Sequence, residues 1–343
     1  MDINERKLKI LKAIIDDFID TAQPVGSRTI AKKYPLGVSS ATIRNEMADL
    51  EDLGFLVQPH ISAGRIPSDA GYRLYVDELM LQSALGRDQM QMIRNLLLSN
   101  MIELEDVVNQ AVTILSKVTG MTAVISLPQF NRSRLTNIKM VRINDSKVLM
   151  ILVADSGVFK TMTLGIRGGD QYILDRITDV LTEKLQGMSI SEINMRTIGS
   201  IKQKLKEYAT VVDYLVPILR NTLREIDEVE VYVEGAHNVL NLPEFQDSVR
   251  AQQFFDLMED AQKLVGLLSS SQTAEGISVR IGGELGMEEL VDCSMITTSY
   301  KVNGQEAGKI AVFGPKRMDY GRAVSALDYI RDTLSEIFSG INL

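Results

Sequence analysis

The stretch VSSATIRNEMADLEDLGFL, residues 38–56, combines a helix start, an amphipathic helix and a helix stop. Ser39 is expected to be the N-cap, and a glycine ends the helix before an apolar strand. Ile43, Met47 and Leu50 recur at i, i+4 and i+7, so these three side chains are predicted to face inward. Short hydroxyl side chains, an arginine and an amide are therefore left near the front of the helix, on its outer side.

Two further helices are predicted before this stretch. Residues 5–20 carry one apolar stripe at helical spacing, with Asn4 as a suitable N-cap. The segment TAQPVG breaks that pattern, and Ser27 is expected to cap a short helix over about 28–34, which YPLG ends. The stretch at 38–56 is therefore the third helix of the chain.

A predicted hairpin follows in FLVQPHISAGRIPS, residues 55–68. It has a short strand, a turn-rich loop and the beginning of a return strand. Ser68 is expected to cap a fourth helix that runs to about Gln82. Three helices followed by such a hairpin are typical of a helix-turn-helix with a wing, so we predict a winged-helix domain over residues 1–85.

The charge distribution agrees with a localised DNA-binding face. The chain has a net charge of −8, which argues against a protein that coats nucleic acid nonspecifically. Residues 1–75 carry 10 Lys/Arg and 10 Asp/Glu, so all of the excess acid lies in residues 76–343. Thr21–Asn45 contains no acid and four bases, which are Arg28, Lys32, Lys33 and Arg44.

In a helix-turn-helix the second helix of the motif enters the major groove with its N-terminal residues at the base edges. Arg44 can bind guanine with both arms of its guanidinium, and Asn45 can read adenine. The hydroxyl side chains and backbone N–H groups at the helix start suit phosphate. The preceding helix is expected to meet backbone phosphate, and the wing the flanking backbone or minor groove. The predicted DNA-binding residues are Ser27, Arg28, Lys32, Ser39, Ser40, Thr42, Arg44, Asn45, His60, Ser62 and Arg65. An ordinary capped surface helix and a solvated loop remain the structural alternatives.

The rest of the chain alternates between strand and helix patterns. Four strands are predicted in about 45 residues after Gly120, with the segments NDS and DSG as hairpin turns. Helices follow at about 171–186, 191–226 and 247–269, and a last helix at about 319–338 comes after further strands. The pattern favours an α+β fold in which one α+β domain is interrupted by an inserted, mostly helical one.

Features of an enzyme or a membrane protein are missing from the sequence. The two histidines and one cysteine are far apart, and no nucleophile-elbow, Walker, zinc-protease or paired-cysteine motif is present. We therefore expect no enzyme activity, no cofactor and no metal site, and RIGGELG at 280–286 is explained by turn geometry. No apolar stretch is long enough to cross a membrane, and MDINERKLKI is unlike a signal peptide. The single Cys293 fits a small buried residue in a cytoplasmic protein.

The segment from Pro24 to Leu79, PVGSRTIAKKYPLGVSSATIRNEMADLEDLGFLVQPHISAGRIPSDAGYRLYVDEL, closely resembles the N-terminal region of the HrcA family of heat-inducible transcription repressors. RIGGELG and VFGPKRMDYGRAVSAL resemble later segments of the same family. The resemblance therefore covers essentially the whole chain.

This resemblance implies a bacterial repressor of the groE and dnaK chaperone operons. Such a repressor binds the CIRCE inverted repeat as a homodimer, and the GroEL chaperonin keeps it active until stress draws the chaperonin away. The implied layout is a winged helix at 1–85, a GAF-like domain at 86–170 and 273–343, and an inserted dimerisation domain at 171–272. The helical stripe at 88–118 and the inserted helices are both candidate dimer surfaces.

Two other function classes stay open at this point. The first is a regulator that senses a small molecule through its GAF-like domain, which a polar cluster inside a real cavity would favour. The second is an enzyme with a DNA-binding appendage, which the missing catalytic motifs oppose. A collapsed apolar core in the GAF-like domain would favour the repressor.

Overall fold

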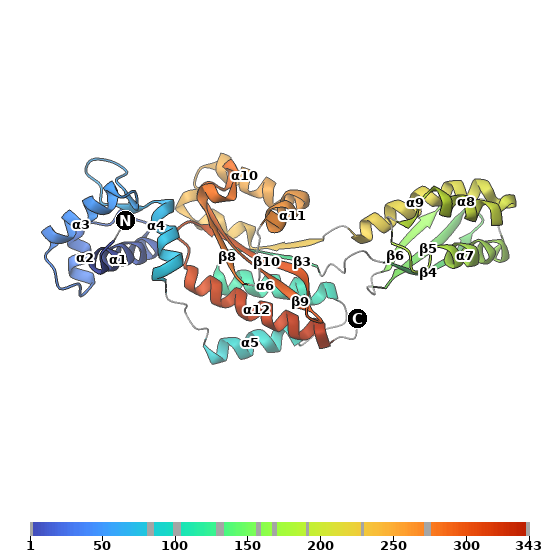
Figure 1. Ribbon diagram of the computed structural model, residues 1–343, viewed down its shortest axis with the longest axis horizontal. Coiled ribbons are helices and arrows are strands. Elements are labelled where there is room, and N and C mark those ends of the chain that lie inside the picture. Colours follow the sequence, from blue (N-terminus) through green and yellow to red (C-terminus); the bar gives the residue numbers. More distant parts are fainter. Residues whose placement is uncertain are drawn as a thin grey trace. The chain divides into compact units, whose positions relative to one another are not determined.

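The structure is a computed structural model, and the chain divides into two compact units. The first unit combines Met1–Leu127 with Glu230–Gly340, and the second is centred on Pro128–Val229. Figure 1 colours both along the sequence. The residues that the structure describes are 3–80, 86–98, 104–127, 134–155, 159–166, 170–189, 192–227, 230–270 and 276–340.

Three helices begin the first unit, and all three predicted helices are confirmed. They are α1 (Glu5–Thr21), α2 (Ser27–Lys33) and α3 (Ser40–Asp52). The side chain of Asn4 caps α1 by accepting from the backbone N–H of Lys7 at 2.8 Å. Their shared core is aliphatic and fully buried, and includes Ile10, Leu11, Ile14, Ile30, Ile43 and Leu50.

The predicted capping role of Ser27 is wrong. Ser27 is the first residue of α2, and Gly26 occupies the N-cap position without a side-chain hydrogen bond. The reason is tertiary: Val25 exchanges two backbone hydrogen bonds of 2.9 Å with Arg65. This pairing keeps the chain extended up to Val25, so the helix starts immediately after Gly26.

A short hairpin follows α3, formed by β1 (Leu56–Val57) and β2 (Ile66–Pro67), which pair antiparallel. Ser68 caps α4 (Asp69–Leu74) by accepting from the N–H of Gly71 at 3.1 Å, as predicted. The chain then makes a π-helical segment, η1 (Tyr75–Leu79), and becomes extended at Met80. The helix is therefore shorter than predicted, and Gln82 lies outside the described residues. Residues 3–79 are called the N-terminal segment below.

A five-stranded antiparallel sheet forms the core of the rest of the first unit, in the order β7-β3-β10-β9-β8. The long β9–β10 hairpin lies near its centre and is almost entirely buried. β3 precedes the second unit in sequence and the other four strands follow it, so the sheet joins two separate chain segments. The strands are β3 (Thr122–Ser126), β7 (Val231–Glu234), β8 (Ser278–Ile281), β9 (Cys293–Val302) and β10 (Gln305–Pro315).

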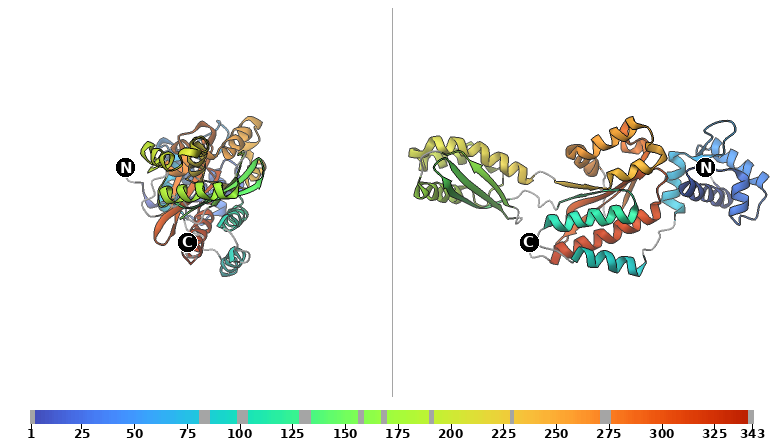
Figure 2. Two further views of the ribbon diagram at one scale, coloured as in Figure 1. Left: turned by 90° about the vertical axis from the view of Figure 1, so that its right-hand side faces the viewer. Right: turned by 180° about the vertical axis from the view of Figure 1, so that it is seen from behind.

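Helices cover both faces of this sheet (Figures 1 and 2). One face carries α6 (Leu104–Thr119) and α12 (Tyr320–Gly340), with α5 (Arg87–Leu98) packed outside these two helices. The other face carries α10 (Ser248–Glu259) and α11 (Ala261–Ser270). The helix predicted over 88–118 corresponds to α5 and α6, and residues 99–103 lie outside the description. Among the described helices, none is both long enough and apolar enough to cross a membrane. Short 3₁₀ turns connect these elements at Ala236–Asn241, Pro243–Phe245, Gly282–Leu285 (η6) and Glu288–Leu290.

The second unit is a three-stranded antiparallel sheet with helices packed on one face. The strands are in the order β4-β5-β6, and their alternate apolar side chains share a core with the helices. Its elements are β4 (Leu135–Asn144), β5 (Lys147–Ala154), β6 (Phe159–Leu164), α7 (Gln171–Leu185), α8 (Met195–Lys204), the turn Lys206–Tyr208 and α9 (Ala209–Asp227).

The domain boundaries expected from the sequence need correction. Residues 135–164 were assigned to the GAF-like domain with 86–127, but β4, β5 and β6 form their own sheet against α7–α9. Residues 247–270 were assigned to the insertion, but α10 and α11 pack on the five-stranded sheet. The second unit is therefore mixed rather than mostly helical. A strand pattern shows that one face is buried but not which element buries it.

Candidate nucleic-acid interface

The outer side of α3 is the best candidate for contact with a duplex. Its inward positions are occupied as predicted: Ile43, Met47 and Leu50 are buried. Four exposed residues follow one another on the opposite side with helical spacing, and we call them the α3 strip. These residues are Ala41, Arg44, Asn45 and Ala48.

The sequence interpretation missed the two alanines of the α3 strip. The signal was available, because positions 41 and 48 lie on the same face as Arg44 and Asn45 when the helical period is followed outward. Small side chains here let the helix backbone come close to a partner. An alanine methyl group can also contact the methyl group of thymine.

The start of α3 is organised by its cap. The Ser39 hydroxyl accepts from the N–H of Thr42 at 3.1 Å and lies 3.0 Å from the Thr42 hydroxyl. The capping role predicted for Ser39 is therefore confirmed. The cap leaves the first N–H groups of the helix, at Ser40 and Ala41, without an intrahelical acceptor. Backbone N–H groups in this position favour an anion such as phosphate.

Two acidic side chains of α3, Glu46 and Asp49, are paired with cations of α1. Glu46 is buried and pairs with Arg6 (Nε–Oε1, 2.7 Å) and with Lys7 (Nζ–Oε2, 3.1 Å), and Asp49 also pairs with Lys7 at 3.0 Å. Burial alone raises the pKa of Glu46, but the hydrogen bonds from Lys7 and Arg6 outweigh it, so the net pKa is lowered. These carboxylates therefore hold α3 against α1 and do not repel an approaching phosphate.

Arg65 is engaged inside the N-terminal segment. Its guanidinium forms an ion pair of 2.7 Å with Glu51 of α3, and its side chain is largely covered. The backbone of Arg65 also forms two hydrogen bonds with the backbone of Val25. Arg65 therefore holds the base of the hairpin against α3 and the approach to α2.

Among the described residues, three of the four basic residues of the predicted face have side chains that are exposed and not engaged in ion pairs. In the part of the chain that the structure describes, Arg28, Lys32 and Arg44 are exposed and form no ion pair. Lys33 instead bonds to Asp17 of α1 at 2.7 Å, and that hydrogen bond raises the pKa of Lys33. Ser27, at the start of α2, is half-buried beside this face.

The tip of the hairpin is preformed. The side-chain amide of Gln58 donates to the carbonyl oxygens of Ile61 at 3.0 Å and Ala63 at 3.1 Å. The backbone N–H of Ala63 donates to the backbone carbonyl oxygen of His60 at 2.8 Å. His60 and Ser62 are exposed, and Ile61 is 99% exposed. Sequence reasoning missed Ile61, although an isoleucine in an otherwise polar turn is an available signal.

The elements that carry these side chains lie together. Figure 1 shows α2, α3 and the hairpin at the end of the first unit, with α4 between them and the five-stranded sheet. The view from behind in Figure 2 agrees. This arrangement leaves the α3 strip, the basic residues of α2 and the hairpin tip open to a partner.

Elsewhere the described residues offer little that could support catalysis. They contain no group of three or more His, Cys, Asp and Glu side chains placed to hold a metal ion. Cys293 is buried in β9, and burial raises the pKa of its thiol to about 12. A thiol with this pKa is a packing residue rather than a nucleophile.

Comparison with solved structures supports the fold. A crystal structure described as that of a hypothetical protein matches with a TM-score of 0.67 and 25% identity, and the match covers 99% of each chain. The mixed helix and sheet architecture is therefore shared over essentially the full length.

Comparison with known sequences identifies the family. The model of the HrcA protein C-terminal domain matches residues 105–324. The heat-inducible transcription repressor HrcA of Clostridium acetobutylicum is 39% identical, with 100% of this chain and 99% of the relative covered. The protein of the same name from Clostridium tetani is 40% identical, with 100% and 98% covered. The chain therefore belongs to the HrcA family of heat-inducible transcription repressors.

Proposed function

We propose that this protein is a homodimeric repressor that binds the CIRCE inverted repeat upstream of the groE and dnaK chaperone operons. In this proposal residues 3–79 are a winged-helix DNA-binding domain with α3 as its recognition helix. The α3 strip is the observation that carries the proposal. It combines an unpaired arginine, an amide and two small residues on a helix in which Glu46 and Asp49 are already paired with Lys7.

Each part of the surface has a distinct role in this proposal. Arg44 and Asn45 read base edges in the major groove, and the alanines beside them contact thymine methyl groups. Ser39, Ser40 and Thr42 receive a phosphate at the start of α3. Arg28 and Lys32, with Ser27 beside them, meet phosphates along the flanking backbone.

The hairpin is proposed to contact the neighbouring minor groove or backbone. His60 and Ser62 supply the polar contacts, and Arg65 holds the hairpin base in place. The exposed Ile61 is proposed to pack against the minor-groove wall, because apolar side chains are used there by other DNA-binding proteins. The hydrogen bonds of Gln58 keep this tip ordered before binding, which reduces the entropy cost of association.

An inverted repeat requires a two-fold dimer, and the second unit offers a surface for one. The face of the β4-β5-β6 sheet opposite α7–α9 carries an apolar patch. We call it the open face, and propose that two copies pair through it as self-complementary surfaces. Its apolar residues are Val141, Ile143, Leu149, Ile151, Val153 and Phe159, of which Ile143 and Phe159 are 54% and 60% exposed.

A repressor is favoured over a small-molecule sensor by the packing of the five-stranded sheet. The side covered by α10 and α11 is filled with buried apolar side chains. Phe245, Phe254 and Phe313 lie in this core, and the first two rings are 5.3 Å apart in an edge-to-face arrangement. In this proposal the five-stranded part is a GAF-like scaffold that needs no cofactor.

Family membership also leads us to propose a cytoplasmic protein whose activity depends on the GroEL chaperonin. GroEL would keep the repressor competent for binding, and unfolded proteins made during stress would compete for the chaperonin. This part of the proposal rests on the resemblance to the family alone.

A titration of labelled CIRCE duplex tests the proposal. Full-length protein should bind CIRCE as a dimer at least about 10³-fold more tightly than a scrambled duplex at about 0.15 M salt. Addition of GroEL should increase the fraction of protein that binds. Equal affinity for both duplexes, with or without GroEL, would overturn the repressor assignment.

A further inference from the structure

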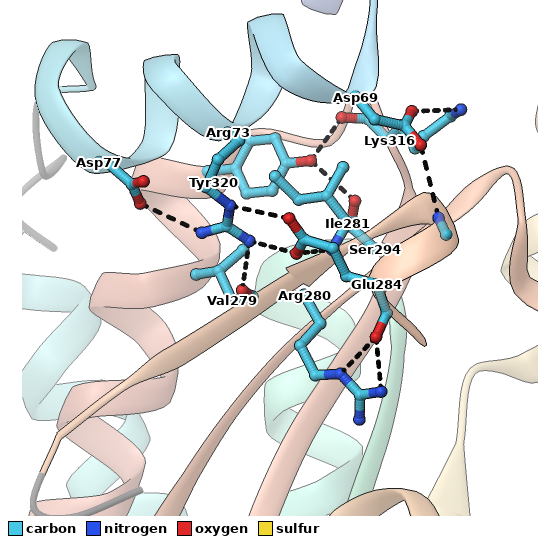
Figure 3. Close-up of polar contacts among 11 residues, drawn as sticks. Asp69, Arg73, Asp77, Val279, Arg280, Ile281, Glu284, Ser294, Lys316 and Tyr320 are labelled. Atoms are coloured by element: carbon cyan, nitrogen blue, oxygen red, sulfur yellow. Dashed lines mark hydrogen bonds and ion pairs between the residues drawn. The ribbon is translucent and has the colours of Figure 1, made fainter. Parts of the chain in front are cut away.

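The N-terminal segment is joined to the five-stranded core by a polar contact centred on Arg73 of α4 (Figure 3). Arg73 donates to Glu284 of η6 through Nε at 3.0 Å and Nη2 at 2.5 Å. Nη2 also donates to the carbonyl oxygen of Val279 in β8 at 2.6 Å, and Nη1 to Asp77 at 3.1 Å. All three guanidinium nitrogens of Arg73 therefore donate hydrogen bonds. A bidentate pair such as Arg73–Glu284 constrains the relative orientation of the two side chains as well as their separation.

A second contact lies at the start of α4. Asp69 accepts from the ammonium of Lys316 at 2.7 Å and from the backbone N–H of Gly283 at 3.4 Å. A Cβ atom on Gly282 would lie 2.3 Å from the Asp69 carboxylate, and Gly282 has a φ of +51°. The carboxylate therefore packs directly on the η6 backbone, at a position that only glycine allows without strain.

A layer of aromatic rings lies beside these ion pairs. Tyr72 and Tyr75 pack against Tyr320 of α12, with ring centroids 6.2 and 6.5 Å apart, and all three side chains are buried. The Tyr320 hydroxyl donates to the Lys316 carbonyl at 2.6 Å and lies 2.8 Å from the Ser294 hydroxyl. The rings cover one side of the ion pairs, whose four side chains remain between 26% and 42% exposed.

The junction gathers segments that are far apart in sequence. RIGGELG supplies Gly282, Gly283 and Glu284, and VFGPKRMDYGRAVSAL supplies Lys316 and Tyr320. Arg73 and Glu284 are separated by 211 residues. From the sequence alone, RIGGELG is explained by turn geometry. In the structure this turn also contacts α4. Contacts from β8, η6 and the segment before α12 reach α4 together, which opposes rotation of the N-terminal segment.

We propose that Asp69, Arg73, Glu284 and Lys316, here called the α4 junction, set the half-site spacing that the repressor accepts. The inference rests on the proposed binding of an inverted repeat. Two recognition helices must meet half-sites at a defined distance and helical phase. A clamped N-terminal segment presents α3 in one direction on its own five-stranded core, so the junction narrows the range of half-site spacings that two copies can fit. Arg73 is therefore a positioning residue, which acts on DNA through the orientation of α3.

The test compares operators that differ only in half-site spacing. The duplexes are native CIRCE, versions with 2 or 5 base pairs added between the half-sites, and a single half-site. Wild type should lose about tenfold or more in affinity at the 5-base-pair insertion, which turns one half-site by about half a helical turn. We call the dependence of affinity on half-site spacing the spacing profile. In Arg73→Ala and Lys316→Ala the affinities for all spacings should lie within about threefold of one another, because the N-terminal segment can reorient. Both should bind the single half-site as wild type does.

Two further variants separate orientation from simple loss of stability. The charge reversal Arg73→Glu should flatten the profile, and Arg73→Glu combined with Glu284→Arg should restore part of the discrimination. The restoration is expected to be partial, because Glu284 also accepts from the backbone N–H of Ile281 at 2.9 Å. Arg94→Ala is the matched control: it removes a two-bond pair with Glu336 that links α5 to α12 and should leave the profile unchanged.

Three results would overturn the inference. Wild type could bind all spacings equally, the Arg73 and Lys316 variants could keep the full discrimination, or these variants could lose single half-site affinity as strongly as operator affinity. Failure of wild type to bind native CIRCE would instead contradict the proposed function itself. Circular-dichroism melts of every variant confirm that the comparison is made on folded protein.

Discussion

At the scale of single residues, the partner decides what a side chain can do. Lys32 and Lys33 are neighbours of identical chemistry on α2, yet only Lys33 is bonded to Asp17. Arg44 and Arg65 differ in the same way, because Arg65 is paired with Glu51 and Arg44 is exposed. The free cations are available to DNA, and the paired ones stabilise the N-terminal segment.

Arg44→Ala should weaken binding to CIRCE by about 1–3 kcal/mol if Arg44 reads a base. The reason is the loss of a bidentate contact to guanine. Fluorescence anisotropy with CIRCE and scrambled duplexes measures the difference. An equal loss on both duplexes would assign Arg44 to phosphate, and unchanged affinity for CIRCE would exclude either role.

Lys32→Ala should weaken binding to any duplex and reduce the slope of log affinity against log salt by about 1. Lys33→Ala is the matched neighbour and should leave that slope unchanged, because its ammonium is already neutralised by Asp17. Titrations between 50 and 200 mM salt measure both slopes. The same change of slope in the two variants would contradict the assignment.

Cys293 should be unreactive in the folded protein at pH 8, because its buried thiol has a pKa raised to about 12 and holds almost no thiolate there. Iodoacetamide labelling followed by mass spectrometry should detect the adduct only after denaturant is added. Rapid labelling of native protein would show that the β9 region opens.

At the scale of elements, α3 is positioned by charge as well as by its apolar face. Ile43 and Leu50 pack into the core, and Glu46 adds the ion pairs to Arg6 and Lys7 of α1. Glu46 thereby holds α3 against α1. The hairpin is positioned similarly, by the backbone bonds between Val25 and Arg65.

Glu46→Gln should lower the free energy of unfolding by roughly 1–2 kcal/mol, since two partly exposed cations lose their charged partner. Because the folded pKa of Glu46 lies below the ordinary value of 4.5, its contribution is present above that value and is lost as pH falls through the folded pKa. Urea unfolding at several pH values should therefore show that the free energy of unfolding falls less steeply with decreasing pH in the variant than in wild type. Glu5→Gln is the control, because it removes an exposed pair with Lys9, and it should change the curve much less than Glu46→Gln does. An identical effect of both variants would contradict the role of Glu46.

At the scale of the whole molecule, the proposed binding of an inverted repeat needs two α3 helices, and each chain supplies one. The open face of the second unit is where we expect the copies to pair. The α4 junction would then hold each N-terminal segment in a fixed direction on its own five-stranded core. In this proposal the affinity for DNA depends on α3, while the accepted half-site spacing depends on the α4 junction.

Ile143→Asp should raise the dissociation constant of the dimer by about tenfold or more, because it places a charge in an apolar contact. Binding to full CIRCE should weaken with it, and binding to a single half-site should stay unchanged. Tyr172→Asp is the control, since Tyr172 is 73% exposed on α7, which packs on the opposite face of the sheet. Sedimentation velocity measures the dimer, and an unaltered dimer in Ile143→Asp would exclude the open face as its surface.

The sequence by itself determined the features that depend on nearby residues. The period of Ile43, Met47 and Leu50, with the Ser39 cap, specifies which side of α3 faces out, because both signals act within a few turns. Strand patterns likewise predicted β4–β6 in the right places. The family resemblance rested on continuous motifs of the same local kind.

Only the tertiary structure decided which elements meet. The sequence did not show that β4–β6 leave the five-stranded sheet, that Glu46 binds Arg6, or that Arg73 binds Glu284 from 211 residues away. Capping and periodicity are set by local backbone and side-chain energies. The choice among distant partners instead depends on the packing of the whole core, where many surfaces have similar apolar patterns. For this reason the candidate DNA-binding face could be predicted from α3, whereas the junction that orients it could not.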